Sequence, residues 1–199
     1  MSRKPNLEMR DHILENAHNL IFKSGFKGVS MDDIAEAAGL KKANLFHYYP
    51  TKEALGLAVF DYAVREVSNE MAARYSSDNV DPAEMVSKMF DGAAQEMQKS
   101  GCSGGCFVGN MAQELSDYNE NLRHKVANHM HLWQQRLADY MDRWRTKGYF
   151  KAEFDTSTAA LGILSLFEGA MLVCKVTRST EALSSSKNVA LSYLQASKA

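Results

Sequence analysis

The stretch VSMDDIAEAAGLKKANLFHYYPTKEAL, residues 29–55, decides how the first part of this 199-residue chain folds. Ser30 is a good helix N-cap, and Asp32 and Asp33 place negative charge in the first turn, where the helix dipole favours it. Apolar residues follow at helical spacing until Gly39 ends the helix, after about two turns. A short helix, a glycine turn and a third helix predict a helix-turn-helix.

The third helix of this unit is expected over residues 41–49, because Pro50 disfavours helical geometry in the residue before it. Leu45 and Tyr49 share one face and are expected to pack inward. The outward face then carries a cation, a small residue, an amide, an imidazole and a phenol, which suit DNA base edges and phosphates. These outward residues are Lys42, Ala43, Asn44, His47 and Tyr48. A polar face on a short helix is usually only solvated, so the surrounding pattern has to support the DNA-binding interpretation.

The flanking residues extend the pattern. A first helix is expected from about Asn6 to Ser24, with Gly25 ending it. Thr51 is expected to cap a fourth helix and to place Lys52 at its N-terminus, where an ammonium and free backbone N–H groups can hold a phosphate. The net charge of −1 argues against a nucleic-acid partner for the chain as a whole. Residues 41–52, however, contain three lysines and no acid, so positive charge is concentrated where DNA binding needs it.

Residues 29–40 and 44–55 together resemble the DNA-binding domain of the TetR family of repressors. The resemblance implies base-reading roles for Lys42, Ala43 and Asn44, and phosphate contacts for His47, Tyr48 and Lys52. Phe46 stands where many members of the family have tyrosine, so one hydroxyl contact to phosphate is missing. Family members pair through their last two long helices, which implies a two-fold dimer that reads a palindrome with two recognition helices about one DNA turn apart.

The whole chain is expected to be all-α. An N-terminal three-helix helix-turn-helix domain, residues 1–55, precedes a helical-bundle sensor and dimerisation domain, residues 56–199. After residue 55 the helices are expected to run to about Tyr75, from Asp81-Pro82 to Ser100, from Cys106 to Asp117, from Glu120 to Thr146, from Thr156 to Val176 and from Leu183 to Leu194. Ser76–Asn79 and the glycine-rich residues 101–105 are expected to be loops.

The helix expected over residues 156–176 is the most apolar one. Gly162 and Gly169 permit close approach, so this helix is buried either in the core or against another subunit. The family resemblance favours a homodimer, and we expect its contact to involve Ile163, Phe167 and Met171.

The sequence says less about the effector site of the sensor domain. Methionines and aromatic residues are numerous enough to line an apolar effector pocket, although each of them suits core filling equally well. Cys102 and Cys106 are too few for a zinc site without matching histidines, so they are either inert thiols or include a reactive one. Residues 105–115 resemble a segment of a TetR subgroup that includes electrophile-responsive regulators. Since Cys106 stands where a helix begins, the helix dipole is expected to lower its thiol pKa and make it the sensing residue.

The leading hypothesis is a homodimeric repressor that binds a palindromic operator and is released by a small molecule or an electrophile. No secretory signal and no run of about 18 apolar residues is evident, so a cytoplasmic protein with free thiols and no membrane partner is expected. Neither a cofactor nor a metal is expected. Two alternatives stay open: an enzyme that pairs Cys106 with a histidine, and a helical interaction protein that has lost DNA binding.

Overall fold

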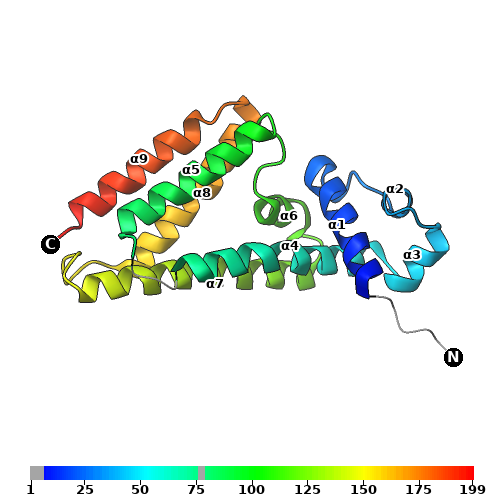
Figure 1. The fold of residues 1–199 in the computed structure, drawn as a ribbon, viewed down its shortest axis with the longest axis horizontal. Helices are drawn as coiled ribbons and strands as arrows, with labels where there is room; N and C mark the ends of the chain where they lie inside the picture. Colours follow the sequence, from blue (N-terminus) through cyan, green and yellow to red (C-terminus); the bar gives the residue numbers. More distant parts are fainter. Residues whose placement is uncertain (1–6, 76–78) are drawn as a thin grey trace. The chain divides into compact units, whose positions relative to one another are not determined.

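The structure is a computed structural model that describes residues 7–75 and 79–199, and within these ranges it is built from α-helices (Figure 1). Asn6, the expected start of the first helix, and residues 76–78 of the expected loop lie outside the described residues. The helices are α1 (Leu7–Ser24), α2 (Met31–Ala37), α3 (Lys42–Tyr48), α4 (Lys52–Tyr75), α5 (Pro82–Lys99), α6 (Phe107–Leu115), α7 (Glu120–Thr146), α8 (Thr156–Thr177) and α9 (Glu181–Ala196). The all-α prediction is confirmed, and each predicted helix is present with ends shifted by at most a few residues.

The described chain forms two compact units. One comprises residues 7–69 together with 110–126, and the other comprises residues 70–75, 79–109 and 127–199. The expected division at residue 55 stays a prediction about functional domains, because packing places residues 56–69 and 110–126 with the helix-turn-helix. Helices α4, α6 and α7 each begin in one unit and end in the other.

The first unit is held together by the apolar faces of its short helices. On α1 the buried residues recur every four positions at Ile13, Ala17 and Ile21. Ile34 of α2 and Leu45 of α3 are also fully buried, each of them 0% exposed. The helical spacing predicted for α2 and the inward packing of Leu45 are therefore confirmed, and α1 has a buried face of the same kind.

The second unit is a bundle of α5, α8 and α9 with the larger part of α7. Figure 1 draws α5, α8 and α9 beside one another, and the three helices contact each other pairwise. Its centre is an aromatic group in which the Phe167 ring lies edge-on to Phe90, with 5.5 Å between ring centroids, and to Trp133, at 5.4 Å. Such edge-to-face pairs add directional stabilisation to the area they bury.

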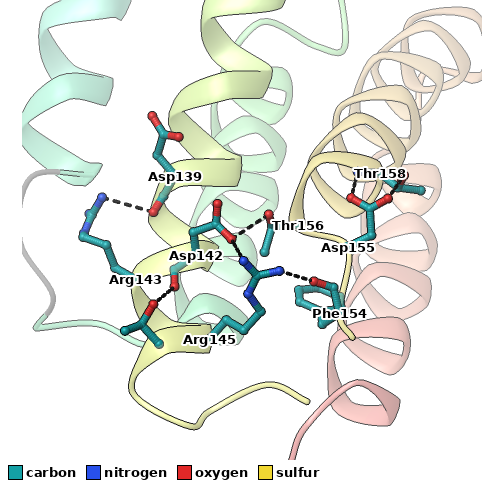
Figure 2. A network of polar contacts seen from close by, with 9 residues as sticks. Asp139, Asp142, Arg143, Arg145, Phe154, Asp155, Thr156 and Thr158 are labelled. Carbon is teal, nitrogen blue, oxygen red and sulfur yellow. Dashed lines mark hydrogen bonds and ion pairs between the residues drawn. The ribbon is translucent and has the colours of Figure 1, made fainter. Parts of the chain in front are cut away.

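The junction of α7 and α8 is fixed by a polar network (Figure 2). Asp142 accepts the hydroxyl of Thr156 at 3.0 Å and forms an ion pair with Arg145 at 2.8 Å. Arg145 also donates to the carbonyl of Phe154 at 2.9 Å. Asp155 caps α8 by accepting the backbone N–H of residue 158 at 3.0 Å, so the helix has a defined start.

Helix α8 differs from expectation in two respects. Ile163, Phe167 and Met171, the predicted dimer contact, are buried in the core of the single chain, so that prediction is wrong. By length and composition alone, the helix could also cross a membrane. Because the sequence has no continuous apolar run, no such helix was expected. Its buried side packs on α5 and α9, as in the core helix of a folded domain.

Candidate DNA interface and effector site

Helix α2 begins with a complete capping box. The Ser30 hydroxyl oxygen accepts the backbone N–H of Asp33 at 3.1 Å, and the Asp33 carboxylate accepts the backbone N–H of Ser30 at 2.7 Å. The backbone N–H of Ser30, and after it the Ser30 hydroxyl, which donates to the same carboxylate at 2.7 Å, lower the pKa of Asp33. The chain turns after α2 at Gly39, whose φ of +64° is the left-handed conformation that glycine adopts without strain. The predicted cap and turn are both confirmed.

Helix α3 presents the face that the sequence predicted. Leu45 and Tyr49 are 0% and 3% exposed and anchor the helix to the first unit, with the Arg10 guanidinium 5.5 Å from the Tyr49 ring centroid. The predicted base-reading residues Lys42, Ala43 and Asn44 are exposed, as is His47, while Tyr48 is half-buried. These residues are therefore wholly or partly open to solvent, and their contacts with DNA stay predictions.

Lys42 has a partner that sequence reasoning missed. Its ammonium forms an ion pair with Asp32 of α2 at 2.7 Å, and both side chains are more than half exposed. A surface pair of this kind is weak, on the order of 0.2–1 kcal/mol, so phosphates or base edges can compete for the ammonium. The pair orients Lys42 between α2 and α3. The sequence does not reveal this ion pair, because the two residues are ten positions apart and meet only through the turn between α2 and α3.

Lys52 begins α4, as predicted. The Thr51 hydroxyl oxygen accepts the backbone N–H of Ala54 at 3.0 Å, which caps the helix. The Lys52 ammonium lies 4.6 Å from the centroid of the Phe26 ring. Gly56 allows this ring to approach, because a Cβ there would stand 2.5 Å from the ring. Lys52 therefore stands at the N-terminus of α4, partly buried and in contact with the Phe26 ring.

Cys106 lies directly before α6, where its Sγ accepts the backbone N–H of Gly109 at 3.4 Å. The expected lowering of its pKa is wrong. Burial, followed by the negative charge of Glu168, raises the pKa of the Cys106 thiol to about 12, and the hydrogen bond from Gly109 offsets only part of this. The helix N-terminus favours thiolate, but desolvation penalises the charged form more strongly here.

Glu168 of α8 is a polar group that the sequence did not single out. Its Oε2 lies 2.6 Å from the position that a Cβ on Gly109 would occupy, so glycine at 109 makes room for the carboxyl group. Its Oε1 is buried and has no hydrogen-bond partner among the described residues. Burial raises the pKa of this carboxyl group, and its hydrogen bond with Cys106 opposes that shift. A buried carboxyl oxygen without a donor costs free energy, so this oxygen can accept a hydrogen bond from a bound molecule.

Cys102, Cys106 and Cys174 are free thiols, as predicted. Cys102 and Cys174 are buried. The group beside Cys106 is the Glu168 carboxyl rather than the histidine that the enzyme hypothesis required. A carboxylate beside a buried thiol keeps it protonated, which is the opposite of what a nucleophile needs.

The outer face of α8 and α9 is apolar and unusually exposed. Two stripes of exposed apolar residues run along it: Leu161, Leu172, Val173 and Val176 on α8, and Val189 and Tyr193 on α9. Between them runs a shallow groove lined by Ser165, Leu166, Gly169, Ala170, Val173, Ala182, Ser185 and Ser186. A Cβ added at Gly162 or Gly169 would meet nothing within 4 Å, so another helix can approach this face closely.

Two family descriptions match the chain: "Bacterial regulatory proteins, tetR family" over residues 13–59, and "Tetracyclin repressor-like, C-terminal domain" over residues 80–189. The transcriptional regulator AcuR of Cereibacter sphaeroides is 26% identical over 155 residues, which are 77% of this chain and 70% of AcuR. The HTH-type transcriptional repressor NemR of Escherichia coli K12 is 20% identical over 183 residues, 92% of each chain. The crystal structure of a TetR-family transcriptional regulator from Cytophaga hutchinsonii has a TM-score of 0.85 over 98% of both chains, at 23% identity.

Proposed function

Since the chain belongs to the TetR family of transcriptional regulators, we propose that it is a cytoplasmic, homodimeric repressor that leaves a palindromic operator when an effector binds. The observation that carries this proposal is the polar, exposed face of α3 opposite its buried anchor residues Leu45 and Tyr49. An anchored recognition helix with a free polar face is the geometry that a major groove accepts.

In the proposed complex, Lys42, Ala43 and Asn44 read base edges, and His47, Tyr48 and Lys52 contact phosphates. Asn44 suits adenine, because an amide can make a bidentate contact with its N6 and N7 atoms. Lys42 leaves Asp32 to reach DNA, which costs little because the pair is exposed. The ammonium of Lys52 and the N-terminus of α4 act on the same phosphate.

The second copy of the chain is proposed to cover the outer face of α8 and α9. Val176 is 75% exposed and Val173 46% exposed, so pairing of this face removes large apolar side chains from water. The glycine and serine residues of the groove allow helices from two subunits to pack closely. A two-fold pair of this kind also supplies the second recognition helix that a palindrome requires.

The effector is proposed to be sensed beside Cys106 and Glu168. A protonated, buried thiol suits reversible binding of a small molecule better than rapid reaction with an electrophile. The unpartnered Oε1 of Glu168 favours an effector that carries a hydrogen-bond donor.

Genomic footprinting tests the proposal as a whole. We expect protection of a palindrome, and a metabolite and electrophile screen on that DNA should then yield a compound that releases it. Cys106→Ser and Glu168→Gln should bind the operator normally and respond less to that compound. Absence of any protected sequence would leave an enzyme or an interaction protein as the better description. If the compound releases DNA from both variants as well as from the wild type, the effector site lies elsewhere.

A further inference from the structure

The loop between α1 and α2 is held by residues far away in the sequence. It comprises residues 25–30, and it sets where α2, and with it α3, begins. Gly25 opens the loop with a φ of +78° and donates its N–H to the carbonyl of Ile21 at 2.8 Å. The rest of the loop has a further backbone hydrogen bond, from the N–H of Val29 to the carbonyl of Phe26 at 3.5 Å, and the buried side chains of Phe26 and Val29 anchor it.

Glu114 of α6 supplies a polar contact to this loop. Its Oε2 accepts the backbone N–H of Lys27 at 2.9 Å. Its Oε1 lies 2.7 Å from the position that a Cβ on Gly25 would occupy, so the carboxylate fits against the glycine where any side chain would collide. A carboxylate that accepts a backbone N–H makes one of the stronger hydrogen bonds of proteins.

The residues after α6 reinforce this contact. The Lys27 ammonium lies 4.1 Å from the ring centroid of Tyr118, so Lys27 is held at its main chain and at its side chain. Lys125 near the start of α7 forms an ion pair with Asp61 of α4 at 2.5 Å. All of these residues belong to the first unit, and within it the segment 110–126 contacts the α1–α2 loop and α4.

Helix α6 connects the residues that contact Lys27 to the proposed effector site through the chain itself. Cys106 precedes the helix, Gly109 lies in its first turn, and Glu114 lies near its end. Nine helical residues span only about 13 Å and form a stiff element. A displacement at the head of α6 therefore moves the carboxylate that holds Lys27.

We propose that Glu114 is the positioning residue through which α6 sets the α1–α2 loop and the placement of the recognition helix for operator binding. The proposal deepens the proposed function and rests on it, since it concerns how DNA binding is regulated. Operator binding by a dimer depends on the spacing of its two recognition helices, because the palindrome has a fixed length. Binding to random DNA depends chiefly on charge. Loss of the Glu114 contact should therefore weaken operator binding and leave random binding nearly unchanged.

The test uses the full-length chain and three variants. Glu114→Ala removes the acceptor, Glu114→Gln keeps an acceptor oxygen without the charge, and Gln113→Ala alters an exposed neighbour on the same helix as a control. Hydrogen exchange at the Lys27 amide, the melting temperature, and affinity for the footprinted operator and for a random duplex are measured for each.

Glu114→Ala should accelerate exchange at Lys27 and weaken operator binding by about tenfold, the change that corresponds to one charge-assisted hydrogen bond. Its random-duplex affinity should stay within about twofold. Glu114→Gln should lie between Glu114→Ala and the wild type, and Gln113→Ala should match the wild type.

A Glu114→Ala chain that exchanges faster at Lys27 but binds the operator like the wild type overturns the proposal, and so does unchanged exchange. If Glu114→Ala does not fold, Glu114→Gln decides by the same two readouts. A wild-type chain that prefers no DNA sequence overturns the proposed function and the role of Glu114 with it. Failure of Glu114 alone leaves the wild-type operator preference intact.

Discussion

Cys106 should react slowly with N-ethylmaleimide, and its reaction should speed up steadily with pH. Its thiol pKa is raised to about 12 by burial and by Glu168. At pH 7.5 the thiolate fraction is then roughly 3 × 10⁻⁵, against about 10⁻¹ for an ordinary cysteine with a pKa of about 8.5. The more basic thiolate is a better nucleophile, and with a Brønsted slope of about 0.45 this recovers roughly 40-fold. The net expectation is a reaction slower on the order of 10²-fold, before limited access slows it further.

Mass spectrometry of the Cys106 peptide, sampled over time between pH 7 and 10, measures this rate. The rate should rise about tenfold per pH unit without a plateau, because the thiol titrates above the whole range. Glu168→Gln removes the negative charge beside the sulfur, so the pKa of Cys106 should fall and its reaction should accelerate at every pH. Cys102→Ser and Cys174→Ser in the same background exclude signal from the other thiols.

A rate that levels off below pH 9 would refute the argument, since it would mean that thiolate is already the main species there. Slower reaction of Glu168→Gln would refute it as well, because the carboxyl would then be assisting the thiol. In either case direct modification of Cys106 by an electrophile would become the better description of the sensor.

Four further predictions concern other parts of the chain. Lys52→Ala should weaken binding to all DNA sequences alike and reduce the slope of log affinity against log salt by about one unit, in titrations at several salt concentrations. Asn44→Ala should instead cost about 1–3 kcal/mol at one operator position and relax base preference there, as operator libraries would reveal. Val173→Glu should convert a dimer to a monomer in sedimentation, whereas Val67→Glu, at an equally exposed valine of α4, should not. Asp142→Ala should destabilise the fold by about 1–3 kcal/mol in denaturant titration, since it deprives the buried Thr156 hydroxyl of its acceptor.

The helix-turn-helix could be predicted nearly completely because its signals are local. Ser30, Gly39, Pro50 and Thr51 act through backbone geometry within a few residues, so their effect can be read without knowing the rest of the fold. Helical periodicity likewise identified the buried face of α3. The exposure of Lys42, Ala43, Asn44 and His47 follows from that face, although their roles came from the family resemblance.

The electrostatic partners could not be predicted for the opposite reason. Glu114 meets Lys27 across 87 positions, and Glu168 lies beside Cys106 only because the fold brings a residue of α8 next to Cys106 and Gly109. Without that packing, the position of Cys106 before a helix predicted a lowered pKa. The helix effect acts on any thiol in that place, whereas burial and a neighbouring carboxyl depend on the fold and outweigh it.

For helix α8, the spacing of apolar residues did not show which side faces the core. Its apolar residues occupy both sides, with Ile163 and Phe167 turned into the core and Leu172 and Val173 turned outward. A helix that is buried in its own subunit on one side and in a partner on the other has no polar stripe, so the sequence cannot tell the two apolar faces apart. Exposure in the single chain distinguishes them. A charge at Phe167 would therefore test folding, and only a charge on the outer face, as in Val173→Glu, tests dimerisation.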